Sequence, residues 1–266
     1  MLNVSRGSSA PPKVVHLVYK PKTKPRKKVV LVGKGVTFDS GGLNIKPTSG
    51  MLTMKSDMAG AAAVLSAMTA LAQTGCRAEV HGLLGLVENM TGGDAYKPGD
   101  ILDTFAGKTV EVGNTDAEGR LVMCDLLAWA AAKLKPDCMI DVATLTGAVV
   151  VALGTEATGL FTRDDALRDG LLAGAAAAGE KVWPLPLYDE YLALLQQGPA
   201  DLHNVGGRWG GAITAALFLG EFVPRDLAWA HLDIAGPAFA ESDAPERDAG
   251  ATGAGTATLI RWLESL

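Results

Sequence analysis

The sequence has few cysteines, and those that it has are not spaced as pairs. Its 266 residues include three cysteines, Cys76, Cys124 and Cys138, with no C-x-x-C pattern among them. An odd number of widely spaced cysteines argues against a disulfide framework and against a thiolate zinc site. We therefore expect the protein to work in a reducing compartment, the cytoplasm.

Long apolar runs are also missing. The most apolar helical stretch, residues 58–72, is too short to span a bilayer and contains Ser66 and Thr69. The first 15 residues hold a charge and a pair of prolines where a signal peptide needs a continuous apolar core. These features predict a soluble protein that neither crosses a membrane nor enters the secretory route.

Acidic residues are absent from the first part of the chain. Residues 1–28 contain eight lysines and arginines and no acid, although the whole chain has a formal net charge of −5. The basic run at 20–28 is interrupted by Pro21 and Pro25 and has no interleaved aromatics, which is typical of a solvated loop. We therefore expect no nucleic-acid binding and interpret residues 1–28 as a basic lead segment of the domain.

Apolar, β-branched runs alternate with helical patterns along the chain. We expect strands at 14–19, 29–33, 78–89, 109–114, 138–145 and 227–234, and helices at 58–72, 121–134, 164–179, 211–222 and 255–265. The first two strands have the composition of buried strands, and we expect them to pair or to lie side by side.

This alternation predicts an α/β fold. We expect one domain over residues 1–266, a three-layer sandwich with a mixed, largely parallel central sheet flanked by helices. In open α/β sheets, functional groups gather beyond the carboxyl ends of the strands. Catalytic or binding residues are therefore expected after residues 33, 89, 114 and 145.

Two segments near residue 40 are similar to a phosphate-binding loop and to a serine-protease nucleophile segment, but neither matches the full motif. The glycine-rich segment 29–47 lacks the spacing of both common phosphate-binding loops. Asp39-Ser40-Gly41-Gly42 resembles the nucleophile segment of trypsin-like serine proteases, but the disulfides, the all-β pattern and a histidine in the right context are missing. We interpret Ser40 as a turn residue.

Carboxylates form the stronger pattern. Asp39 follows an expected strand, and Asp57 directly precedes the helix at 58–72, where it could simply cap the helix. In N-T-D-A-E-G-R at 114–120, Asp116, Glu118 and Arg120 are spaced by two, so an extended backbone would point them to one side. That segment could also be an ion-paired turn without chemistry.

Four carboxylates carry the charge that two divalent cations neutralise. Without cations, a buried cluster of this kind would be costly through repulsion and desolvation. The sequence has neither H-E-x-x-H nor paired cysteines, so a zinc site here would be rich in carboxylates. The residues therefore favour a two-metal site.

Seven motifs occur together and in one order along the chain: VGKGVTFDSGG, NIKP, MKSDMAGAAAV, NTDAEGRL, DVATLTGA, GGRWGGAITAALFLGEFV and WAHLDIAGPAF. In these motifs the chain resembles the leucine (cytosol) aminopeptidases, which are two-metal exopeptidases. The resemblance covers nearly the whole chain, and NTDAEGRL is its most specific part.

The resemblance implies a role for each site residue. The ligands of the more tightly held metal would be Lys34, Asp39, Asp57 and Glu118. The more exchangeable metal would be bound by Asp39, Asp116 and Glu118, with Asp39 and Glu118 bridging the two ions. The lysine ligand would have to be neutral, which two nearby dications favour by depressing its pKa.

The resemblance also implies catalytic and substrate-binding residues. Lys46 would stabilise the oxyanion of the tetrahedral intermediate. Arg120, together with the backbone near Leu145, would bind a bicarbonate that acts as the general base. The positions that match the family's substrate pocket are Met54, Asn114, Ala117, Thr144 and Gly147.

The implied reaction is hydrolysis of the first peptide bond of an unblocked peptide, with leucine and other apolar N-terminal residues preferred. We expect two divalent ions per chain, zinc or manganese, with magnesium or cobalt as further candidates. Two alternatives stay open: an inactive fragment or binding protein that retains the metal site, for nucleic acid or another protein, and a metal-dependent hydrolase that acts on other substrates.

The chain departs from the family in two respects. Asp57-Met58-Ala59-Gly60 stands where the family commonly has Asp-Met-Gly-Gly, a one-methyl change that we expect the site to tolerate. The N-terminal domain of the family is not recognisable, so we expect the catalytic domain alone. Because the family forms hexamers largely through catalytic domains, we also expect a homo-oligomer.

Overall fold

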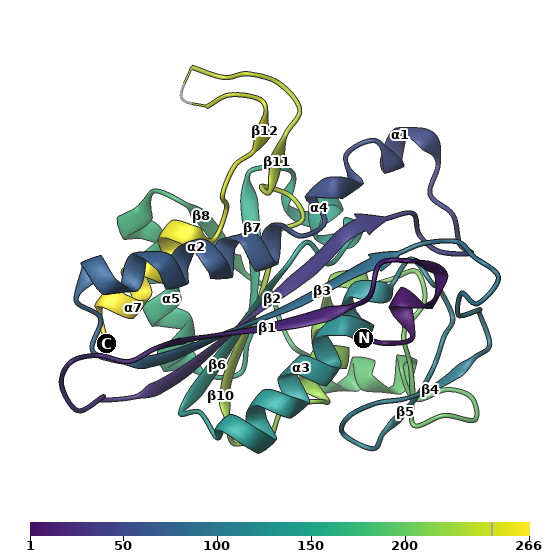
Figure 1. Cartoon of the computed structure of the whole chain (residues 1–266), viewed down its shortest axis with the longest axis horizontal. Helices are drawn as coiled ribbons and strands as arrows, with labels where there is room; N and C mark the ends of the chain where they lie inside the picture. Colours follow the sequence, from purple (N-terminus) through teal and green to yellow (C-terminus); the bar gives the residue numbers. More distant parts are fainter. Residues whose placement is uncertain (246) are drawn as a thin grey trace.

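The computed structural model describes residues 1–245 and 247–266. A mixed seven-stranded sheet lies at its centre, in the order β1-β3-β2-β6-β10-β7-β8 (Figure 1). These strands are β1 (Lys13–Tyr19), β2 (Lys28–Asp39), β3 (Glu79–Asn89), β6 (Cys138–Ala143), β7 (Ala157–Thr162), β8 (Lys181–Pro184) and β10 (Ala228–Asp233). The expected mixed, largely parallel sheet is therefore confirmed.

Four neighbouring strands of the sheet are parallel. β3, β2, β6 and β10 run in one direction, whereas β1 and β7 are antiparallel to the strands that they join. The carboxyl ends of the four parallel strands consequently meet at one edge of the sheet. This edge is where open α/β sheets place their ligands.

Helices cover both faces of the sheet, as a three-layer sandwich requires (Figure 1). α2 (Ala59–Thr74), α5 (Asp165–Ala178) and α7 (Thr256–Glu264) lie on one face, and α3 (Glu118–Leu134) and α6 (Gly211–Gly220) lie on the other. Along β2, Leu31 packs toward α2 while Val30 and Val32 pack toward α3. Because successive side chains of a strand point to opposite faces, a continuous apolar run is what a strand buried on both faces needs.

Shorter elements complete the chain. A three-stranded sheet contains β4 (Ile101–Asp103), β5 (Thr109–Glu111) and β9 (Leu202–His203), and β11 (Phe239–Ala240) pairs with β12 (Gly250–Ala251). The remaining helices are α1 (Thr48–Met51), α4 (Gly147–Leu153) and the 3₁₀-helices η1 (Val4–Gly7), η2 (Met54–Ser56) and η3 (Asp189–Leu194). No helix within the described residues has the length and hydropathy needed to cross a bilayer.

The expected neighbourhood of the first two strands is wrong. β3 lies between β1 and β2, and β1 pairs antiparallel with β3 at the edge of the sheet. Val14 and Val18 are each 49% exposed, whereas Val15 and Leu17 pack against the core. β1 thus has the one-sided burial of an edge strand, which its β-branched composition alone does not reveal.

The segment 109–114 also differs from expectation. Its strand, β5, belongs to the small three-stranded sheet and not to the central one. The strand–helix–strand pattern from 109 to 145 therefore does not form a unit of the central sheet. It connects the small sheet to β6 through α3, and the turn before α3 reaches the carboxyl edge.

Candidate metal centre

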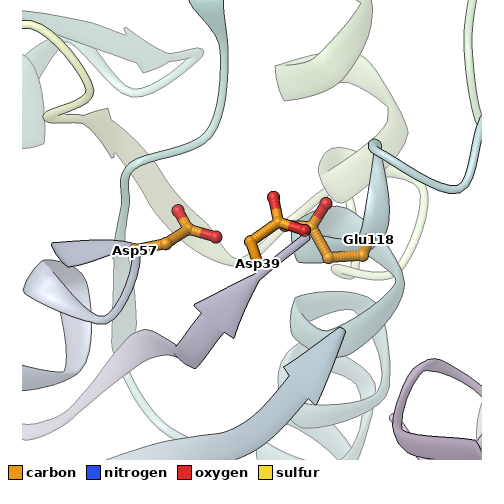
Figure 2. A group of neighbouring side chains, drawn as sticks. All are labelled: Asp39, Asp57 and Glu118. Atoms are coloured by element: carbon orange, nitrogen blue, oxygen red, sulfur yellow. The ribbon is translucent and has the colours of Figure 1, made fainter. Parts of the chain in front are cut away.

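Three buried carboxylates come together at the carboxyl edge of the sheet (Figure 2). Asp39 is the last residue of β2, Asp57 follows η2 just before α2, and Glu118 is the first residue of α3. Each is at most 5% exposed. One carboxylate oxygen from each lies within 4.8 Å of the other two, so the three side chains can act as ligands of one metal ion.

Lys34 joins two of these carboxylates. Its Nζ lies 2.8 Å from Asp57 Oδ1 and 2.8 Å from Glu118 Oε1, and it donates to the carbonyl oxygen of Thr144 at 2.8 Å. Burial alone would lower the pKa of Lys34, but the negative charges of Asp57, Glu118 and Asp39 outweigh it and raise the pKa. The lower pKa that we expect for Lys34 applies to the site with two dications bound. Without them, the contacts with Asp57, Glu118 and Asp39 favour the ammonium form of Lys34.

Gly119 makes room for this lysine. A Cβ at position 119 would lie 2.7 Å from both Cε and Nζ of Lys34, which is too close for any real side chain. The glycine of NTDAEGRL therefore allows the first turn of α3 to pass directly over the Lys34 ammonium group.

Lys46 joins Asp39 to the fourth acid of the site. Its Nζ lies 2.9 Å from Asp39 Oδ2 and 2.6 Å from Asp116 Oδ1. Burial opposes the charge on Lys46, yet Asp39 and Asp116 raise its pKa above the ordinary value. The site thus consists of two lysines, each placed between a pair of acids.

The acids of the site outnumber the lysines, and two of the acids have raised pKa values. Burial, together with the charge of Asp39, raises the pKa of Asp57 and of Glu118 above the ordinary range. The Lys34 ammonium opposes this rise for both groups without cancelling it. A cluster that disfavours its own full ionisation would be stabilised by additional positive charge.

Two oxygen atoms of the cluster support the same conclusion. Asp57 Oδ2 and Glu118 Oε2 are buried, and neither has a hydrogen-bond partner among the described residues. A buried acceptor without a partner is costly, whereas hard divalent cations bind carboxylate oxygens readily. The donor set therefore fits a divalent metal, with Lys34, Asp39, Asp57, Asp116 and Glu118 as the residues that could hold it.

Further groups fix the orientation of these acids. Asp39 Oδ1 accepts hydrogen bonds from Asn89 Nδ2 and from the backbone N–H of Gly41, both at 2.8 Å. Asp57 Oδ1 accepts from the Thr144 hydroxyl at 2.7 Å. The side chain of Asp57 does not cap α2, whose N-cap is Met58, so the interpretation of Asp57 as a capping residue is wrong.

The acids and lysines line a pocket of about 420 Å³. Of the other residues singled out in the sequence, Met54, Thr144, Leu145 and Gly147 also line it. The segment after β10, which belongs to the motif WAHLDIAGPAF but was assigned no role from the sequence, contributes Ala235, Gly236, Ala238 and Phe239. The rule that found the other loops, searching beyond strand ends, would have found this one after the expected strand at 227–234.

Three expected site residues lie outside the lining of this pocket. Asn114 and Ala117 belong to the turn before α3, where Asn114 Oδ1 accepts from the backbone N–H of Asp116 at 2.8 Å. Arg120 is buried, and its Nη1 donates to the carbonyl oxygen of Asn204 at 2.8 Å. Because α3 begins at Glu118, the backbone there is helical, and the expectation that Asp116, Glu118 and Arg120 point to one side of an extended chain is wrong.

Comparison with known proteins gives the same pattern over the whole chain. The family model described as "Cytosol aminopeptidase family, catalytic domain" matches residues 1–260. Proteins named "Probable cytosol aminopeptidase" are similar: that of Chlorobaculum tepidum is 52% identical, with 99% of this chain and 52% of that protein covered. That of Aquifex aeolicus is 50% identical, with 99% and 53% covered. The chain thus spans about half the length of the curated relatives that it matches.

Solved structures show the same likeness. The structure titled "Bottromycin maturation enzyme BotP" has a TM-score of 0.93 and 46% identity, with 99% of this chain and 57% of that chain covered. The structure titled "Bottromycin maturation enzyme BotP in complex with Mn" has a TM-score of 0.95 and 45% identity, with 99% and 58% covered.

Proposed function

The chain belongs to the cytosol aminopeptidase family, and we propose that it carries the catalytic site of a two-metal aminopeptidase. The substrate would be an unblocked peptide whose N-terminal residue is removed by hydrolysis. One observation carries this proposal: buried acids with unpartnered oxygens contact Lys34 and line, together with it, a pocket of about 420 Å³. The alternative of a binding protein has no comparable support among the described residues.

The chain's own residues would divide the work. Lys34, Asp39, Asp57, Asp116 and Glu118 would hold two divalent ions, which supply Lewis-acid activation of the scissile carbonyl and of a water molecule when bound. Lys46, whose ammonium lies 2.9 Å from Asp39 Oδ2, would add positive charge where the oxyanion develops. Arg120 and Leu145 are the candidates for binding a bicarbonate base; Leu145 lines the pocket, and Arg120 is buried and donates to the Asn204 carbonyl.

The pocket supports a preference for apolar side chains. Met54, Val150, Ala238 and Phe239 contribute apolar side chains to its lining, and a Cβ at Gly147 would meet no described atom within 4 Å. Leucine and other apolar N-terminal residues would bury their side chains there, and the hydrophobic effect would favour them over polar ones.

Manganese is the first metal to test, because a similar structure is a complex with Mn. A carboxylate-rich site also accepts zinc, magnesium or cobalt with different affinities. A homo-oligomer, a hexamer by the family resemblance, and a cytoplasmic location complete the proposal.

Hydrolysis of leucine p-nitroanilide and of its N-acetyl form tests the proposal. With added Mn²⁺ we expect cleavage of the free amine only. A chelator should abolish this activity because it removes the metal, and Asp116→Asn should reduce it by at least about 100-fold because it weakens a metal ligand. Asp165→Asn is the matched control, because Asp165 is 84% exposed on α5 and pairs with Arg168 on the same helix. Equal cleavage of the acetylated compound would indicate a different metal-dependent hydrolase, and no cleavage of either would favour the inactive or binding protein.

A further inference from the structure

Asn204 is a buried residue whose side chain contacts the turn before α3. It follows β9 directly and is fully buried. Its side chain faces residues 113–117, the irregular segment that leads from β5 to Asp116 and Glu118. Neither the family motifs nor the pocket lining singles it out.

Every polar atom of the Asn204 side chain is used on this turn. Oδ1 accepts from the backbone N–H groups of Gly113 at 2.7 Å and Asn114 at 3.2 Å. Nδ2 donates to the carbonyl oxygens of Asn114 at 2.7 Å and Ala117 at 3.4 Å. One amide therefore satisfies backbone groups at both ends of the turn.

The main chain of Asn204 adds two more contacts on either side. Its N–H donates to the carbonyl of Glu111 at 2.9 Å, and its carbonyl accepts from Arg120 Nη1 at 2.8 Å. Asn204 is thereby fixed to the strand before the turn and to the first turn of the helix after it.

The turn depends on partners of this kind. Its backbone is not in a sheet and precedes α3, so apart from the hydrogen bond from the Ala117 N–H to the Asn114 carbonyl at 3.2 Å, its N–H and C=O groups depend on side chains. Tyr96 and Asn89 pair the carbonyl of Thr115 at 2.7 and 3.0 Å, and the Asn204 amide pairs the groups before and after it. Removing the amide would leave the partly buried N–H groups of Gly113 and Asn114 without this acceptor, and the turn would move to find new partners.

We propose that Asn204 is a positioning residue that holds the turn 113–117 so that Asp116 and Glu118 reach the metal centre together. This inference rests on the proposed function, because it concerns how well the site binds its metals. Residues that orient metal ligands typically change metal affinity or activity by about 10–100-fold when they are replaced.

Metal titration of the whole chain distinguishes positioning from a general role in stability. The readouts are the Mn²⁺ concentration that gives half-saturation, from equilibrium dialysis and from leucine p-nitroanilide hydrolysis, and the thermal midpoint. In Asn204→Ala the main-chain contacts to Glu111 and Arg120 can persist, so the variant isolates the amide. We expect its half-saturating Mn²⁺ concentration to rise about 10–100-fold.

Thr258→Val is the matched control. The Thr258 hydroxyl is buried on α7, on the opposite face of the sheet, and donates to Glu180. This variant should lose stability without a change in the Mn²⁺ half-saturation point. An unchanged half-saturation point in Asn204→Ala, or an equal shift in both variants, overturns the inference.

Asn204→Asp keeps the test decisive if Asn204→Ala does not fold. It retains acceptors for Gly113 and Asn114 but loses the donor to Asn114 and Ala117, so we again expect weaker Mn²⁺ binding. Wild-type affinity in a folded Asn204→Asp overturns the inference. Failure of the wild type to bind Mn²⁺ would instead overturn the proposed function, and this inference with it.

Discussion

At the scale of single residues, the site is defined by the pairing of two lysines with four acids. Lys34 lies between Asp57 and Glu118, and Lys46 lies between Asp39 and Asp116. Lys34 reaches its position because residue 119 has no side chain. The position of this buried amine in the candidate metal centre thus depends on the missing methyl group of residue 119 as well as on its ionic partners.

Replacing Gly119 with alanine should therefore damage the site. The new Cβ would lie 2.7 Å from Lys34 Nζ, so the end of the lysine side chain must shift from its present position between Asp57 and Glu118. Alanine favours the helix by about 1 kcal/mol over glycine, so the fold itself should tolerate the change. We expect Mn²⁺-dependent activity to fall by about 10–100-fold with little change in the thermal midpoint.

The matched control is Gly93→Ala, because Gly93 is exposed and a Cβ there meets no described atom within 4 Å. It should leave activity unchanged. Wild-type activity in Gly119→Ala would show that the position of Lys34 does not matter for the site.

At the scale of secondary structure, the carboxyl edge of the sheet is held together by polar groups at strand ends. Asp233, the last residue of β10, accepts from the backbone N–H of Leu145 at 3.0 Å, from the Thr146 hydroxyl at 2.7 Å and from the N–H of Ala235 at 3.2 Å. It thereby ties the loop after β6 to the loop after β10, and both loops line the pocket.

The pH dependence of stability should reveal this carboxylate. Burial raises the pKa of Asp233, although His231, Thr146 and Leu145 oppose the rise. The folded state then keeps the proton at pH values where the unfolded state, with a pKa of about 3.9, has lost it. Its contribution to stability is therefore largest at low pH and decreases as the pH rises through the folded-state pKa.

Asp233→Asn removes this titration. Thermal unfolding of both proteins from pH 4 to pH 7 should show the stability of the wild type, relative to the variant, decreasing with pH. A relative stability that increases with pH would mean that Asp233 is ionised more easily in the folded state, so that its hydrogen bonds and His231 outweigh its burial.

Local sequence predicted most elements of the central sheet but not their order. The apolar runs at 29–33 and 78–89 correspond to β2 and β3, because burial on both faces leaves a mark in composition. That β3 lies between β1 and β2 depends on pairing between distant strands, which no local pattern records. The short β7 and β8 were missed because small and polar residues interrupt their apolar pattern.

The site was predictable to a similar degree. The positions of Asp39, Asp57, Asp116 and Glu118 followed from the ends of predicted elements and from the family motifs. The contact of Arg120 with Asn204 did not, because it depends on where α3 begins and on a loop more than 80 residues away in sequence. The family resemblance predicted the ligand and catalytic residues, whereas residues that hold them in place, such as Asn204, could be identified only from the structure.

At the scale of the whole molecule, the site lies where two separately packed layers meet. One core packs α2, α5 and α7 against the sheet, and the other packs α3 and α6 against its opposite face. Asp57 stands before α2 and Glu118 begins α3, so the cluster is complete only when both layers are in place. Metal binding should therefore stabilise the fold as a whole, by mass action on the native state.

The cysteines report on the integrity of this packing. Cys76, Cys124 and Cys138 are free and buried, and burial raises the pKa of each thiol, that of Cys138 to about 12. Since the thiolate is the reactive form, we expect no labelling by a thiol reagent at pH 8 in the native protein and three labels after denaturation. Rapid labelling of the native protein would show that one of the layers opens readily.

The most direct test of the two-metal site is the number of Mn²⁺ ions bound per chain, measured by elemental analysis after equilibrium dialysis. The wild type and the control Asp165→Asn should each bind two ions, and the double variant Asp57→Asn, Glu118→Gln should bind fewer, because it removes two of the buried carboxylate charges. Absence of bound metal in the wild type, or two ions retained by the double variant, would contradict the assignment of this cluster as the metal centre.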